Sequence, residues 1–98
     1  MNAAEKLEVL KTIYPDEAAL DRLLAKLLER VLADYRPRLQ RHEQPLRDFE
    51  TRYAMTSSTF HRRFQAGELG DAMDFFEWAG LYELRQDLVA KIARLEGT

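Results

Sequence analysis

The sequence contains no cysteine, and this absence excludes three kinds of chemistry. The chain cannot form a disulfide, bind a metal through a thiolate, or use a cysteine as a nucleophile. Long apolar runs are also missing: no apolar stretch exceeds five residues, whereas roughly 20 are needed to span a bilayer. The opening segment, MNAAEKLEVLK, mixes acids with lysines and does not form a secretory signal. We therefore expect a cytoplasmic protein that does not enter a membrane.

Glycine and proline are scarce, with four and three residues in a chain of 98. No segment alternates apolar and polar residues with β-branched character, whereas Leu, Ala, Glu and Arg are abundant. This composition favours an all-α fold. We expect one helical domain over residues 1–98, arranged as an elongated hairpin or bundle. Its expected parts are a short helix at 3–14, a long helix at 15–53 that starts at Pro15, and a C-terminal helical half at 56–98.

Within the expected long helix, apolar positions recur at alternating spacings of three and four. This heptad pattern is typical of a helix that pairs with another along a narrow seam. Such a helix would be about 58 Å long, more than a single chain of this size can cover. We therefore expect a homodimeric coiled coil whose interface includes Leu28, Leu32, Tyr35, Leu39, His42, Leu46 and Phe49. Pro37 and Pro45 disfavour an unbroken helix, and both a kinked continuous helix and two separate helices remain open.

The segment after the long helix carries signals for a short helix, a turn and a last helix. Thr56 or Ser57 is suited to cap the short helix at about 57–65, and Gly67 is suited to end it. Asp71 is expected to cap the last helix, with Asp74 as its capping-box partner.

The residue types that most enzymes need are sparse. The only histidines are His42 and His61, and neither has the Glu-x-x-His or His-Glu-x-x-His spacing of a helical metal site. Gly67 and Gly70 lack the lysine and the third glycine of a phosphate-binding loop, and no Gly-x-Ser-x-Gly elbow is present. We predict no enzymatic activity, no metal site and no cofactor.

A DNA-binding alternative depends on residues 49–65, which can form a helix, a tight turn and a second helix. The second helix would present side chains suited to base edges and phosphates, namely Ser58, His61, Arg62 and Arg63. The segment MTSSTFHRRF resembles the recognition helix of AraC-type regulators. In the competing structural interpretation, Phe60 and Phe64 hold this helix on the bundle while the arginines stay in water.

Charge is distributed unevenly along the chain. Residues 36–65 contain seven arginines against three acidic residues, whereas residues 66–98 contain seven acidic residues against three basic ones. The two segments either face different partners or face each other within one chain.

The segment GDAMDFFEWAGLY, residues 70–82, places four aromatic residues among three acidic ones. Large aromatic residues and methionine are enriched at the centres of protein interfaces. We assign Phe75 and Tyr82 to the core. The predicted partner-binding residues are Glu68, Asp71, Met73, Asp74, Phe76, Glu77 and Trp78. In the competing interpretation, the rings pack within the chain on Phe49, Tyr53, Phe60 and Phe64.

The segment FETRYAMTSSTFHRRFQAGELGDAMDFFEWAGLYEL resembles a family of small bacterial and archaeal proteins identified as antitoxins. The resemblance covers residues 46–84, and its most specific part is GELGD followed by DFFEW. The chain departs from the family pattern at Ala54, where glycine is preferred, and at Ala72, where an acid is preferred. The resemblance implies a non-enzymatic protein that binds and neutralises a small protein toxin encoded nearby, and that can regulate its own operon. A structural homodimer without a further partner is the remaining alternative.

Overall fold

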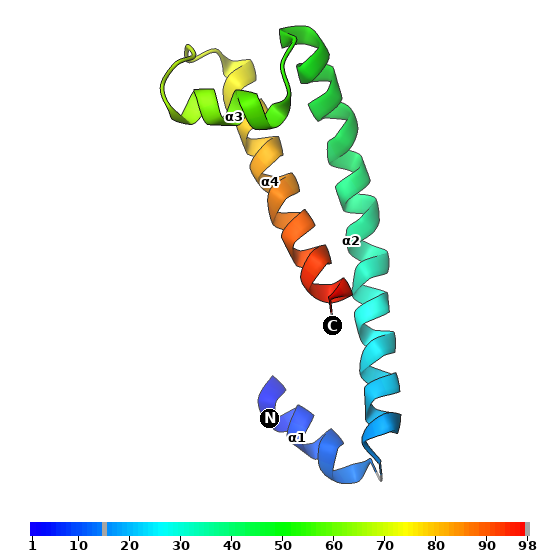
Figure 1. Cartoon of the computed structure of the whole chain (residues 1–98). Coiled ribbons are helices and arrows are strands. Elements are labelled where there is room, and N and C mark those ends of the chain that lie inside the picture. Colours follow the sequence, from blue (N-terminus) through cyan, green and yellow to red (C-terminus); the bar gives the residue numbers. More distant parts are fainter. Residues whose placement is uncertain (15, 98) are drawn as a thin grey trace. The chain divides into compact units, whose positions relative to one another are not determined.

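The computed structural model describes residues 1–14 and 16–97 of the chain. Within these residues the chain forms four α-helices and no strand, which confirms the predicted all-α fold (Figure 1). The helices are α1 (Ala3–Ile13), α2 (Glu17–Tyr53), α3 (Ser57–Gln65) and α4 (Met73–Glu96). The expected position of Pro15 at the start of the long helix lies outside the described residues.

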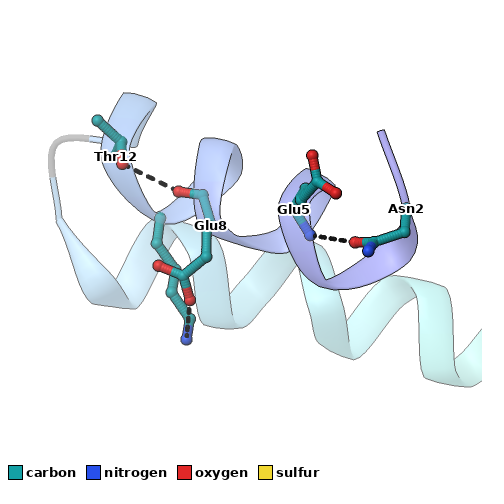
Figure 2. A network of polar contacts seen from close by, with 5 residues as sticks. Asn2, Glu5, Glu8 and Thr12 are labelled. Carbon is teal, nitrogen blue, oxygen red and sulfur yellow. Dashed lines mark hydrogen bonds and ion pairs between the residues drawn. The ribbon is translucent and has the colours of Figure 1, made fainter.

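Helix α1 is stabilised by local polar contacts (Figure 2). At its start, the side chain of Asn2 accepts a hydrogen bond from the backbone amide of Glu5 at 2.8 Å. Towards its end, the hydroxyl of Thr12 donates to the backbone carbonyl of Glu8 at 2.9 Å. The Asn2 cap satisfies one of the amides that a helix start leaves without an intrahelical partner.

Helix α2 is one continuous helix of 37 residues that contains both Pro37 and Pro45. The side chain of Asp16 accepts a hydrogen bond from the amide of Ala19 at 2.6 Å and so caps its start. Of the two alternatives that the prolines left open, the structure has the continuous helix. Each proline still leaves the carbonyl four residues earlier without its usual amide donor.

By its internal contacts the chain divides into two compact units, Met1–Ala33 and Asp34–Thr98. Helix α2 contributes its first part to one unit and its remainder to the other. In the first unit Leu20 is buried. Five large apolar side chains among the described residues of this unit are exposed, namely Met1, Val9, Ile13, Leu27 and Val31.

The core of the second unit is built from aromatic rings on three helices. Phe60 of α3 and Trp78 of α4 are fully buried and stack with their ring centroids 3.8 Å apart. Phe49 of α2 stacks on Trp78 at 5.5 Å, and Leu46 and Ala79 complete the buried cluster. Phe75 and Tyr82, the two rings assigned to the core, are partly buried against it. Such ring pairs add a specific attraction to the burial of apolar area.

The predicted dimer seam of α2 is partly covered by the chain itself. Leu32, Leu46 and Phe49 are buried within the single chain, and each is 6% exposed or less. Trp78 and Ala79 of α4 belong to the cluster that covers Leu46 and Phe49. The assignment of these three residues to a dimer interface is therefore corrected, because they are already buried without a second copy. The remaining seam residues, Leu28, Tyr35, Leu39 and His42, are half-buried, and dimerisation itself stays a prediction.

Two residues that follow helices have left-handed backbone conformations. Gly67 follows α3 with φ at 74°, which confirms it as a helix stop, because glycine has no Cβ to clash there. Ala54 follows α2 with φ at 52° and must adopt the same conformation with a Cβ. The left-handed conformation costs an L-residue about 1–2 kcal/mol. This strain gives a physical reason for a preference for glycine at position 54.

We expect Ala54→Gly to raise the free energy of unfolding by about 0.5–1 kcal/mol, and Gly67→Ala to lower it by about 1 kcal/mol. A Cβ added at Gly67 meets no atom within 4 Å, so this loss comes from backbone strain and not from a steric clash with a neighbour. Urea unfolding followed by circular dichroism measures both changes. Shifts of the same sign for the two variants would contradict the backbone explanation.

Candidate protein-interaction site

Trp78, one of the predicted partner contacts, lies at the centre of the core instead. Its side chain is fully buried, and its indole N–H donates a hydrogen bond to the hydroxyl of Ser57 at 2.9 Å. Leaving a buried donor of this kind unpaired would cost about 1–3 kcal/mol. The assignment of Trp78 to a partner surface is therefore wrong, because its ring stacks on Phe49 and on Phe60 inside the core.

Ser57 connects Trp78 to the start of α3. It is 5% exposed, and its amide donates a hydrogen bond to the carboxylate of Glu50 at 2.7 Å. Thr56 is the N-cap, and its hydroxyl accepts a hydrogen bond from the amide of Thr59 at 3.2 Å. The carboxylate of Glu50 also suits the positive end of the helix dipole. The roles of Glu50 and Ser57 were missed, since one sequence does not show which hydroxyl a buried indole will meet.

Asp74 connects the first turn of α4 to the last turn of α2. One of its carboxylate oxygens accepts hydrogen bonds from the hydroxyl of Tyr53 at 2.6 Å and from Arg52 at 2.9 Å. The Tyr53 bond first, and then the Arg52 bond, lower the pKa of Asp74 below its ordinary value. The N-cap of α4 is Ala72, with no side-chain cap, so the predicted capping by Asp71 and Asp74 is wrong. Asp74 thus forms these hydrogen bonds within the chain, and its role as a partner contact stays a prediction.

We expect the contribution of Asp74 to stability to disappear in acid. Its pKa is lowered in the folded state below the ordinary value of 3.8, so the contribution is complete above about pH 5. It is lost as the pH falls through the folded-state pKa. Urea unfolding of the wild type and of Asp74→Asn from pH 7 to pH 2 should show a less stable variant at pH 7 and a narrowing difference in acid. A difference that is independent of pH would contradict the role of the ionised carboxylate.

Two apolar side chains of the predicted surface are open to solvent. Met73 is 80% exposed and Phe76 is 54% exposed, both in the first turns of α4. The ring of Phe64 supports Phe76 from one side through an edge contact, with the centroids 5.4 Å apart. Asp71 and Glu77 are exposed on the same segment, and neither forms an ion pair with another described residue. We call Asp71, Met73, Phe76 and Glu77 the apolar–acidic patch.

The basic segment 36–65 and the acidic segment 66–98 face each other at several points in the second unit. The pairs are Arg36 with Glu96 at 3.0 Å, Arg52 with Asp74 at 2.9 Å, and Arg63 with Glu68 at 3.3 Å. The intramolecular alternative is confirmed for these pairs. Exposed pairs of this kind are screened by water and add little to stability. Glu68, a predicted partner contact, thus already has a cation beside it.

The short turn that the DNA-binding alternative requires joins α2 to α3. On α3, Ser58 and Arg62 are exposed. The other two candidate residues lie beside carboxylates of the chain: His61 Nε2 is 3.1 Å from Glu83, and Arg63 pairs with Glu68. A phosphate placed at these two residues would therefore meet negative charge as well as positive charge.

Helix α4 also presents two further residues to solvent, at positions that were not predicted as partner contacts. Leu84 is 54% exposed and Gly80 is partly exposed. The spacing of Met73, Phe76, Gly80 and Leu84 by three or four residues places them on one side of the helix. The sequence contains this spacing, but neighbouring aromatic residues on the other sides of the helix make it hard to tell which side is exposed.

No protein-family model, curated protein or solved structure matches the chain. Among the helices formed by residues 1–14 and 16–97, none combines the length and the hydrophobicity needed to cross a membrane. The same part of the chain holds no cluster of three or more metal-binding side chains of the His, Asp or Glu type.

Proposed function

We propose that this chain is a cytoplasmic, non-enzymatic antitoxin-type protein that binds and neutralises a small protein toxin encoded nearby. The observation that carries the proposal is the exposure of Met73 and Phe76 at the start of a helix whose other rings form the core. Soluble monomers rarely expose several large apolar side chains next to one another. Where they do, the patch often marks an interaction surface. Autoregulation of the operon is the further expectation from the family resemblance.

The chemistry of the patch suits a protein partner. Methionine and phenylalanine are enriched at interface centres, where burial of their side chains supplies most of the favourable free energy. Phe76 is held in place by Phe64, so less side-chain freedom is lost on binding. The buried aromatic cluster beneath the patch gives it a rigid support, because Trp78 and Phe60 fix the helices that carry it.

The test is co-expression of the tagged full chain with the protein encoded beside its gene. We expect the two to co-purify, and the chain to relieve growth inhibition by its neighbour. The double variant Met73→Ser with Phe76→Ser should weaken the complex by at least about tenfold. Val89→Ser is the matched control, because Val89 is another exposed apolar residue of α4 outside the patch.

The circular dichroism spectrum and melting temperature of the double variant should stay close to those of the wild type, since it removes only exposed groups. The proposal would be overturned if the wild-type chain formed no complex, or if the double variant bound the neighbouring protein as strongly as the wild type does.

The DNA-binding regulator is the second candidate, and the exposure of Ser58 and Arg62 on α3 favours it. It predicts a mobility shift of the chain's own promoter that weakens steeply with added salt. Arg62→Ala should remove most of that shift. A shift at low salt that is insensitive to this substitution, or no shift, would rule out α3 as the reading helix. The structural homodimer remains the explanation if both tests are negative.

A further inference from the structure

Helix α4 carries an apolar line on its outer side that extends well beyond the apolar–acidic patch. Met73, Phe76, Gly80 and Leu84 follow one another at spacings of three, four and four residues. Residues at these spacings share one side of an α-helix. Met73, Phe76 and Leu84 are all more than half exposed. We call these four residues the outer face of α4.

Gly80 lies in the middle of this face, and the chain's own packing does not require it. A Cβ built at Gly80 meets no atom within 4 Å, and its backbone is helical without a positive φ. Glycine inside a helix is less favourable than alanine, because it loses more backbone freedom on folding. No internal contact needs a glycine at this position. The close approach of another backbone to the centre of the exposed apolar line would explain why glycine is there.

The charges around the outer face are mainly negative. Asp71 and Glu77 are exposed without ion-pair partners among the described residues. Glu83 faces His61, which carries a charge only when it is protonated. Asp87 is the exception, because Lys91 lies 2.9 Å from it. A segment that binds along this face is therefore favoured if its apolar side is flanked by lysine or arginine.

We propose that the outer face of α4 binds an amphipathic helix of a partner protein, with basic residues along both edges of its apolar side. Met73, Phe76 and Leu84 supply the apolar contacts, and Gly80 lets the two helix backbones approach closely. This inference rests on the proposed function, since it specifies which chemistry the partner presents to the same site. It extends that site along α4 to Gly80 and Leu84.

The decisive variant is Gly80→Gln. Glutamine is a better helix former than glycine and its Cβ meets no atom of the chain, so the variant should melt at a higher temperature than the wild type. The same substitution adds bulk where the partner helix must approach. We therefore expect a more stable protein that binds about tenfold more weakly. Ala93→Gln is the matched control, because Ala93 is exposed on α4 at a position that lies on another side of the helix.

The probe is a fluorescein-labelled helical peptide of about 18 residues, five turns of helix. Leucine occupies its apolar positions and lysine occupies its flanks. Fluorescence anisotropy with the full chain should show binding that weakens with added salt, and at least about tenfold weaker binding of a Leu/Glu peptide of the same pattern. Equal binding of the two peptides, no binding, or equal binding by the wild type and Gly80→Gln would overturn the inference.

The same variants separate this inference from the proposed function. If the neighbouring protein co-purifies equally well with the wild type and with Gly80→Gln, the inference fails and the proposed function stands. If the Leu/Lys peptide binds and Gly80→Gln weakens it while the neighbouring protein does not co-purify, the proposed function fails and the inference stands. Sedimentation that changes from dimer to monomer on Gly80→Gln would show that a second copy covers this face, which also overturns the inference.

Discussion

Trp78→Ala is expected to lower the free energy of unfolding by about 3–5 kcal/mol. The substitution removes a fully buried ring that stacks on Phe60 at 3.8 Å and on Phe49 at 5.5 Å. It also leaves the Ser57 hydroxyl without its donor. Native domains have a total stability of about 5–15 kcal/mol, so this loss is a large fraction of the total. Urea unfolding followed by circular dichroism gives the measurement.

Because Trp78 is the only tryptophan, its fluorescence reports directly on its environment. We expect blue-shifted emission and weak quenching by acrylamide in the folded wild type. Trp78→Phe and Ser57→Ala should each cost about 1–3 kcal/mol, because each leaves one partner of a buried hydrogen bond unpaired. The double variant should cost less than the sum of the two. Leu84→Ala, at an exposed position, should change stability by only about 0.5 kcal/mol. A loss below about 1 kcal/mol in Trp78→Ala would contradict the central position of its ring.

The heptad pattern of α2 shows why sequence predicts the burial of a face better than it predicts what covers that face. The spacing of Leu32, Leu46 and Phe49 correctly indicated positions that leave water. The same spacing serves a second copy and a helix of the same chain equally well. Leu46 and Phe49 are covered by α4 of the same chain, which brings Trp78 against Phe49. This depends on the direction in which the chain turns after Tyr53.

Phe76 and Trp78 illustrate the same limit at the candidate site. Both are large rings in one helix, two residues apart, and therefore point to different sides of it. Sequence alone could predict that some rings of α4 face inward and others outward, but not which. Trp78 is the ring that faces inward, where its indole N–H donates a hydrogen bond to the buried Ser57 hydroxyl at 2.9 Å. Asp74 was likewise expected to act locally as a cap, whereas Tyr53 and Arg52, more than 20 residues earlier, hold it.

Pro45→Ala is expected to raise the free energy of unfolding by about 2 kcal/mol. A proline inside a helix costs about 3 kcal/mol, because it removes an amide donor and its ring clashes with the carbonyl four residues earlier, here that of Arg41. Alanine restores the amide and removes the clash. Part of the gain is offset, because the variant's unfolded chain has more conformational entropy. This lowers the free energy of the unfolded state by about 0.4–1 kcal/mol.

Thermal unfolding should show this gain as a rise of roughly 8–16 °C in melting temperature, since about 1 kcal/mol corresponds to 4–8 °C for a chain of this size. Gln40→Ala is the control, because Gln40 is exposed in the same helix and its replacement changes helix propensity alone. Pro45 is half-buried and, with Phe49 and Glu77, lines a cavity of about 210 Å³. A fall in melting temperature would therefore mean that the pyrrolidine ring contributes more through contacts with neighbouring side chains than it costs in the helix.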